Sequence, residues 1–187
     1  MNGSSRQSAF DTAARELASP ILHFIERSVG NRAVAEELQQ ETLLRMYKGL
    51  SSFAGRSSVK TWAFSIARRV VADYLRHPDR ERSIVALDET EEPIDPEREI
   101  DQRLVESEMN ECIRAVIETL PESYRSALLL HDLEGLSAVQ TADVCECSVA
   151  TAKIRIHRAR HKLKDALAKQ CDFYHDKESV FRCDRKA

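Results

Sequence analysis

The hydrophobic positions along the chain recur mainly at intervals of three and four residues, which predicts a protein built from helices. Helical segments are expected near residues 10–29, 32–50, 59–76 and 104–120, and again from residue 121 onward. In the first segment, Ser19-Pro20 has the composition of an N-cap followed by a first helical position. One short helix is therefore expected to end there and another to begin.

The helix expected over residues 59–76 carries a regular apolar stripe. Its members recur every four residues: Trp62, Ile66, Val70 and Tyr74. This spacing places them on one face of a helix, so we expect them to form its buried side. Residues 51–58, which contain a glycine and four serines, are expected to form a loop before this helix.

A second pattern lies near the C-terminal end. Ser137 with Gln140 forms a capping box at the start of a short helix, and Ser148 is placed to cap a longer one. The longer helix has an unbroken apolar seam at Val149, Ala152, Ile156, Ala159, Leu163 and Ala166. A short helix, a tight turn and a longer basic helix predict a helix-turn-helix. The alternative is a surface helix whose basic face is simply solvated.

Charge is distributed unevenly, although the net charge is only −3. Residues 79–111 contain thirteen acidic and four basic residues, whereas residues 151–169 contain seven basic residues and one acidic residue. The first stretch also contains two prolines, so we expect an acidic flexible linker over 79–103. The basic stretch is typical of a surface that contacts nucleic acid.

Several classes of protein are disfavoured by the sequence. No apolar run is long enough to span a membrane, and residues 1–10 lack the apolar core of a signal peptide, so we expect a cytoplasmic protein without membrane insertion. The chain has no glycine-rich phosphate loop and no nucleophile elbow, and its six histidines do not have metalloprotease spacing. We therefore expect a binding protein and not an enzyme.

The C-terminal half resembles the C-terminal domain of RNA polymerase sigma factors, most closely those of the extracytoplasmic-function group. The resemblance is carried by residues 120–125 (LPESYR), 131–137 (HDLEGLS), Ala142, and 147–160 (CSVATAKIRIHRAR). It implies that the second helix of the helix-turn-helix enters the major groove of the −35 promoter element. The residues implied in this contact are Ser148, Thr151, Lys153, Arg155, Arg158 and Arg160.

The N-terminal half resembles the other main domain of the same family. Residues 35–42 (AEELQQET) resemble the segment that docks on the polymerase, which implies polymerase contacts by Glu36, Glu37, Gln40 and Glu41. Residues 53–58, 60–62, 66–69 and 73–76 resemble the loop and helix that open and capture the −10 element. The residues implied in that contact are Phe53, Arg56, Ser57, Ser58, Lys60, Trp62, Arg68 and Arg69.

Physical chemistry supports these assignments, because a loop with aromatic and small polar residues beside a basic helix offers stacking, a pocket and phosphate contacts to an unstacked base. Phe53 and Trp62 also have a plainer interpretation as core residues. Arg68 and Arg69 on an isolated helix would usually be solvated.

The resemblance implies an all-α protein of two small helical domains that acts with core RNA polymerase and promoter DNA. The expected parts are residues 1–78, which dock and open DNA, the linker 79–103, the helix-turn-helix domain 104–170, and a cysteine-containing tail 171–187. In the family the linker threads the RNA exit path, and an anti-sigma factor commonly controls activity. The rivals are a stand-alone helix-turn-helix regulator and a helical adaptor without DNA contact.

Four positions depart from the family pattern. Arg69 stands where the family often has asparagine, and Glu146 stands in the helix-turn-helix turn where it often has glycine. A positive φ at that turn is costly for glutamate, so the turn is expected to differ slightly. Ala138 and Val139 occupy positions that are commonly acidic in the family.

The chain has five cysteines, and this odd number argues against a disulfide framework. Zinc bound by Cys171, His175 and Cys183, together with Cys145 or Cys147, is one alternative. The spacing does not match a standard zinc knuckle, so free or redox-responsive thiols are favoured and no cofactor is expected.

Overall fold

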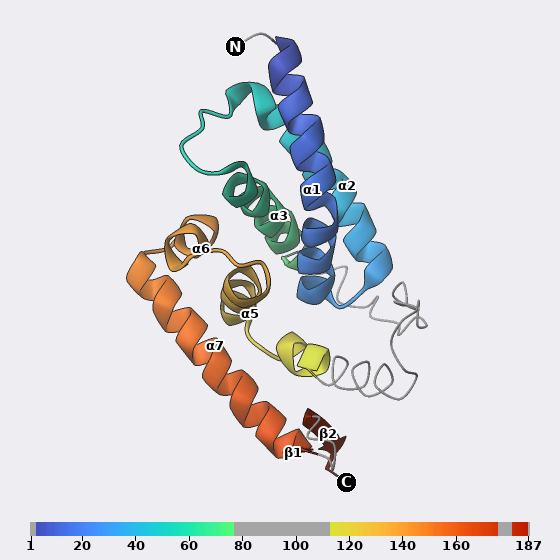
Figure 1. Cartoon of the computed structure of the whole chain (residues 1–187), viewed down its shortest axis with the longest axis vertical. Coiled ribbons are helices and arrows are strands. Elements are labelled where there is room, and N and C mark those ends of the chain that lie inside the picture. The colour runs from blue at the N-terminus through green and yellow to red at the C-terminus, as the bar shows by residue number, and fades with distance from the viewer. Residues whose placement is uncertain (1–2, 77–112, 176–180, 187) are drawn as a thin grey trace.

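The computed structural model describes residues 3–76, 113–175 and 181–186. The described residues are helical apart from loops and a short terminal hairpin, which confirms the expected all-α class (Figure 1). The acidic linker expected over residues 79–103 lies outside the described residues. So does most of the helix expected over 104–120, of which residues 113–118 are described and helical.

Three helices form the N-terminal part of the molecule. They are α1 (Gly3–Val29), α2 (Arg32–Gly49) and α3 (Val59–Leu75), with the short 3-10 turn η1 (Leu50–Ser52) after α2. The three pack against one another in pairs. Phe24 of α1 meets Phe64 of α3 edge to face, with ring centroids 5.6 Å apart, and both side chains are fully buried.

The break expected at Ser19-Pro20 is wrong, because α1 continues through Pro20 as a single helix. Pro20 removes one backbone donor. The exposed turn at Glu16 leaves the unpaired carbonyl close to solvent. Leu17 before the proline and Ile21 after it pack against the same core, so their burial carries the helix across the proline.

The stripe expected on α3 is displaced from the face that is actually buried. Val70 is buried, but Trp62, Ile66 and Tyr74 are only half-buried. The buried residues of α3 are Thr61, Ala63, Phe64, Ala67, Val70 and Val71. Small side chains at three of these positions let α3 pack closely against α1 and α2, which leaves Trp62 and Ile66 at the edge of the core.

The C-terminal part is built from short helices against one long helix. Its elements are α5 (Glu122–Leu128), the π-helical turn η3 (Leu129–Leu133), α6 (Ala138–Val144) and α7 (Val149–Gln170). The Glu134 amide donates to the Leu129 carbonyl at 3.0 Å, which is the wider i to i−5 bond of a π-turn. The capping box of Ser137 and Gln140 is present, as predicted, and Ser148 accepts from the Thr151 amide at the start of α7.

The tail forms a hairpin of β1 (Cys171–His175) and β2 (Phe181–Arg185), which the sequence did not predict. The strands are antiparallel and pair Cys171 with Arg185 and Phe173 with Cys183. The hairpin follows α7 directly at the C-terminal end of the chain (Figure 1).

The two helical parts pack against each other. Buried residues of α1 and α3 belong to the same apolar cluster as buried residues of α5, η3 and α6. Direct contacts join α3 to α6 and α1 to α5, and Figure 1 shows α6 next to α3. No helix among the described residues is long and apolar enough to cross a membrane.

Candidate nucleic-acid interface

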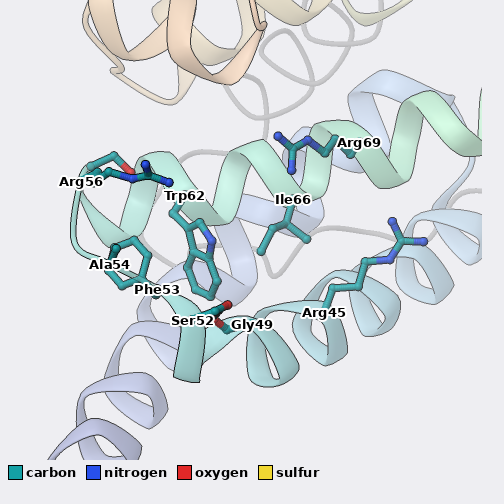
Figure 2. Close-up of a pocket in the computed structure, with 10 residues that line it drawn as sticks. Arg45, Gly49, Ser52, Phe53, Ala54, Arg56, Trp62, Ile66 and Arg69 are labelled. Carbon is teal, nitrogen blue, oxygen red and sulfur yellow. Dashed lines mark hydrogen bonds between the residues drawn. The ribbon is translucent and has the colours of Figure 1, made fainter.

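A cavity of about 330 Å³ opens where the end of α2, the loop after η1 and one side of α3 meet (Figure 2). Its lining residues are Arg45, Gly49, Ser52, Phe53, Ala54, Arg56, Ser57, Trp62, Ile66 and Arg69. The volume lies at the lower end of the range for small-molecule sites, so the cavity suits a group of modest size.

Two aromatic rings form one wall of this cavity. The Phe53 and Trp62 ring centroids are 4.8 Å apart and the rings are tilted by 34°. Gly49 leaves room for this placement, because a Cβ there would make a tight contact of 3.1 Å with Cζ2 of the Trp62 ring. A positive φ at Gly55 turns the loop that carries Phe53 back towards α3. Both glycines therefore favour this position of the wall.

Three guanidinium groups surround the cavity. Arg45 donates to Glu41 at 2.7 Å and to Asp73 at 3.3 Å, and these bonds raise its pKa. Arg56 is exposed and forms no ion pair with another described residue. The Arg69 guanidinium donates two hydrogen bonds to Glu146. Together these groups supply positive charge at the rim of an aromatic-walled cavity.

Five of the eight residues predicted for the −10 contact line this cavity: Phe53, Arg56, Ser57, Trp62 and Arg69. The sequence analysis did not identify Arg45. This residue lies on α2, whereas most of the cavity lining comes from the loop after η1 and from α3, so the sequence around Arg45 does not indicate that it reaches the cavity. Ile66, which was assigned to the core, also lines the cavity.

The other three predicted residues lie outside the cavity. Ser58 is the N-cap of α3, where its side chain accepts from the Thr61 amide at 3.0 Å. Lys60 donates to the Glu134 carbonyl at 2.5 Å. Arg68 lies against the C-terminal part, with 16% of its side chain exposed and an ion pair with Glu122 at 3.8 Å. Its buried Nε has no hydrogen-bond partner.

The helix-turn-helix presents its basic residues on the outer side of α7. Ala152, Ile156 and Ala159 are buried, and α7 packs against α5 and α6. Of the six residues predicted for the −35 contact, Ser148, Lys153, Arg158 and Arg160 are exposed, and Thr151 and Arg155 are half-buried. Arg160 is bound to Asp132 through Nε at 2.8 Å. The predicted seam is thus buried at its centre, whereas Val149 at its start is 37% exposed and Leu163 and Ala166 at its end are half-buried.

The turn between α6 and α7 has a positive φ of 51° at Glu146, so glutamate adopts here the conformation that the sequence analysis regarded as costly for it. Glycine adopts this conformation without strain, whereas glutamate does not. The two hydrogen bonds from Arg69 lower the pKa of the Glu146 carboxyl. Glu146 is therefore held as a carboxylate in a backbone conformation that disfavours it.

The residues predicted for polymerase contact lie on α2. Glu36, Glu37 and Gln40 are exposed, and 43% of the Glu41 side chain is exposed. Glu36 accepts from Arg32 and Glu41 accepts from Arg45, each pair four residues apart. Leu44 and Tyr47 continue this surface and are 46% and 55% exposed, which makes an apolar extension that the sequence analysis did not single out.

Two of the cysteines are described as free thiols. Cys145 is buried at the end of α6, and burial raises its pKa to about 11, whereas Cys147 is half-buried. Among the residues that the structure describes, no three histidine, cysteine or acidic side chains form a metal-binding group. The side chains of Cys171, His175 and Cys183 lie outside the described set, so zinc in the tail stays an alternative.

The fold and its two basic surfaces define a helical DNA-binding protein with a C-terminal helix-turn-helix. Comparison with protein families extends this assignment. Residues 14–81 match the model of sigma-70 region 2, and residues 110–163 match that of sigma-70 region 4. The two matches appear in the order that the sequence analysis expected.

Individual relatives agree with these matches. The chain is 31% identical over 173 residues to the RNA polymerase sigma-H factor of Pseudomonas aeruginosa, covering 85% of this chain and 86% of that protein. It is 39% identical over 131 residues to the ECF sigma factor SigC of Mycobacterium tuberculosis, covering 69% and 68%. Its fold matches the sigma factor RpoE of Bartonella quintana, solved with the anti-sigma factor NepR, with a TM-score of 0.68, 23% identity and coverage of 86% and 97%.

The chain belongs to the sigma-70 family of RNA polymerase sigma factors, within the extracytoplasmic-function group. It is a transcription-initiation factor that directs RNA polymerase to promoters, and not an enzyme. The alternatives of a stand-alone regulator and of an adaptor without DNA contact do not account for the match to region 2 across the N-terminal half.

Proposed function

We propose that the cavity between α2 and α3 receives a base that leaves the stack when the −10 element opens. The observation that carries this proposal is the combination of the Phe53–Trp62 wall with the Arg56 and Arg69 guanidinium groups at one cavity. An aromatic face stacks on any base, and a guanidinium pairs with the adjoining phosphate. Ser57 adds a hydroxyl at the cavity lining. Arg45 adds a further positive charge at the rim of the cavity.

Ser58, Lys60 and Arg68, which lie outside the cavity, have other roles in this proposal. Ser58 positions the start of α3 through its cap. Lys60 and Arg68 are occupied by contacts with the C-terminal part in this arrangement, so they are available to DNA phosphates once the two parts separate.

The outer face of α7 reads the −35 duplex in this proposal. Ser148 and Thr151 lie at the N-terminal end of the helix, which is the end that approaches base edges in helix-turn-helix proteins. The basic residues that follow contribute phosphate contacts, which are sensitive to salt. These are Lys153, Arg155, Arg158 and Arg160.

The exposed surface of α2 is the proposed docking site for core polymerase. Glu36, Glu37, Gln40 and Glu41 form its polar part, and Leu44 and Tyr47 extend it with apolar area. In this proposal residues 1–78 dock on core polymerase and open DNA, the linker 79–103 spans the polymerase, and residues 104–170 read the −35 duplex. We propose that the protein acts in the cytoplasm, where an anti-sigma factor restrains it by covering surfaces of both domains.

Permanganate footprinting of promoter complexes formed with variants of the cavity tests its role. Arg56→Ala should reduce promoter opening, measured by permanganate reactivity of unpaired thymines, while polymerase binding stays unchanged. Arg15→Ala, which removes an exposed arginine of α1 outside the cavity, is the matched control. Equal opening by the two variants would remove Arg56 from the proposed site.

A further inference from the structure

The closed arrangement of the two helical parts is incompatible with simultaneous binding of both promoter elements. The −10 and −35 elements are separated by about 25 base pairs, or roughly 85 Å at 3.4 Å per base pair. In the structure, Arg69 at the proposed −10 cavity bonds directly to Glu146, two residues before Ser148 at the proposed −35 surface. The two parts must therefore separate before the protein can engage a promoter.

Arg69 and Glu146 are two of the positions at which this chain departs from the family pattern. The Arg69 Nε and Nη2 atoms donate to the same Glu146 oxygen at 2.9 and 2.6 Å. Each residue stands where the family often has an uncharged residue, asparagine or glycine, which could not form this ion pair. The two departures thus meet in one ion pair across the interface between the parts.

We propose that the Arg69–Glu146 pair is an electrostatic latch that favours the closed, promoter-incompetent arrangement of this chain. The positive φ at Glu146 supports this role, because glutamate stands at a position where glycine would fit without strain. Its carboxylate is the group of the turn that reaches α3.

The latch competes with DNA, and this consequence rests on the proposed function of the cavity. Arg69 lines the cavity and also holds Glu146, so a phosphate bound at the same guanidinium displaces the carboxylate. Lys60 is withdrawn from DNA in the same way by the Glu134 carbonyl. Promoter binding and closure of the two parts therefore compete for the same cationic side chains.

The size of the shift in the open–closed equilibrium follows from the solvent exposure of the two paired side chains. The side chains of Arg69 and Glu146 are 61% and 55% exposed, so the pair is screened by solvent and salt. A pair of this kind shifts an equilibrium by about 1.5- to 5-fold. The apolar cluster shared by the two parts provides the rest of the stability of the closed state. Loss of the latch therefore shifts the populations of open and closed molecules without abolishing closure.

Single-molecule energy transfer on the full chain measures these populations directly. Dyes attached through non-natural residues at the exposed positions Lys48 of α2 and Lys162 of α7 leave the native cysteines in place. Glu146→Gln should raise the ratio of open to closed molecules by about 1.5- to 5-fold. Asp143→Asn, which removes an exposed acid of α6 three residues earlier, is the matched control and should leave the ratio unchanged.

A charge-reversal cycle separates a specific pair from general damage. Arg69→Glu and Glu146→Arg should each open the molecule, and the double variant should return the ratio towards that of the wild-type chain. If the double variant is as open as the sum of the single changes, or if Glu146→Gln behaves like Asp143→Asn, the latch is refuted.

Transcription at limiting protein separates this inference from the proposed function. With core polymerase, Glu146→Gln should yield up to about fivefold more promoter-specific transcript than Asp143→Asn. Equal yields alongside an active wild-type chain would overturn the regulatory role of the latch alone. A wild-type chain that gives no promoter-specific transcript would overturn the promoter-binding role, whatever the energy-transfer cycle shows.

Discussion

The ring of Phe53, on the loop after η1, lies 4.8 Å from the ring of Trp62 in the first turn of α3. This contact joins a loop to a helix that begins six residues later, and it leaves both rings half-buried beside a cavity. A pair that served only the core would be fully buried, as Phe24 and Phe64 are. The partial exposure of Phe53 and Trp62 is what makes the wall available to a stacked base.

Removing the Phe53 ring should weaken promoter opening. Stacking of a base on an aromatic side chain contributes about 1–3 kcal/mol. Phe53→Ala is therefore expected to lower the equilibrium fraction of open complex by roughly 5- to 150-fold, measured by permanganate footprinting.

Leu75→Ala is the control for that change, because Leu75 of α3 is a 42% exposed apolar residue outside the cavity. It should leave opening unchanged. If Phe53→Ala opens promoters as well as the control does, Phe53 does not stack on DNA.

Loss of the capping box should destabilise the helix-turn-helix. The Ser137 hydroxyl accepts from the Gln140 amide, and the Gln140 side chain accepts from the Ser137 amide. Ser137→Ala removes the first of these bonds at a cost of about 1 kcal/mol. A melting temperature lower by about 2–4 °C is expected in calorimetry. An unchanged melting temperature would show that water replaces the cap.

Glycine at position 146 should stabilise the folded chain relative to glutamine there. Both variants lose the ion pair with Arg69, so they differ mainly in the strain of the turn at φ 51°. Glu146→Gly is expected to exceed Glu146→Gln by about 1 kcal/mol in the free energy of unfolding. Denaturation by urea measures the difference, and a less stable glycine variant would contradict the strain argument.

The buried thiol of Cys145 should make stability depend on alkaline pH. Burial raises its pKa to about 11 from an ordinary value of 9.0, so the folded state favours the protonated thiol. The contribution is complete below pH 9 and is lost as pH rises from 9 to 11, with a limit of about 3 kcal/mol. Cys145→Ala should flatten this dependence. Retention of the same alkaline loss in that variant would assign it to other groups.

Local sequence signals predicted the elements whose ends are set by neighbouring residues. The caps at Ser137 and Ser148 are examples, because each hydroxyl needs only an amide three residues away. The helix bounds of α2 and α3 were also predicted to within about two residues. Family resemblance added the five predicted residues that line the cavity, since their order on a loop and a helix was recognisable.

Features that depend on contacts between remote segments were not predictable in this way. Helix α1 crosses Pro20 because side chains on both sides pack on a core that includes α3. Arg45 reaches the cavity rim from α2, and Arg69 meets Glu146 from 77 positions away. Helical periodicity describes one helix at a time, so it could not identify which face of α3 the other helices would cover.

Run-off transcription with core RNA polymerase, with and without this protein, is the most direct test of its assigned role. A template library that contains extracytoplasmic-function promoters should give promoter-specific transcripts only when the protein is added. The same protein carrying Phe53→Ala should give fewer of them at equal polymerase occupancy. Transcripts that are identical with and without the protein would contradict the account.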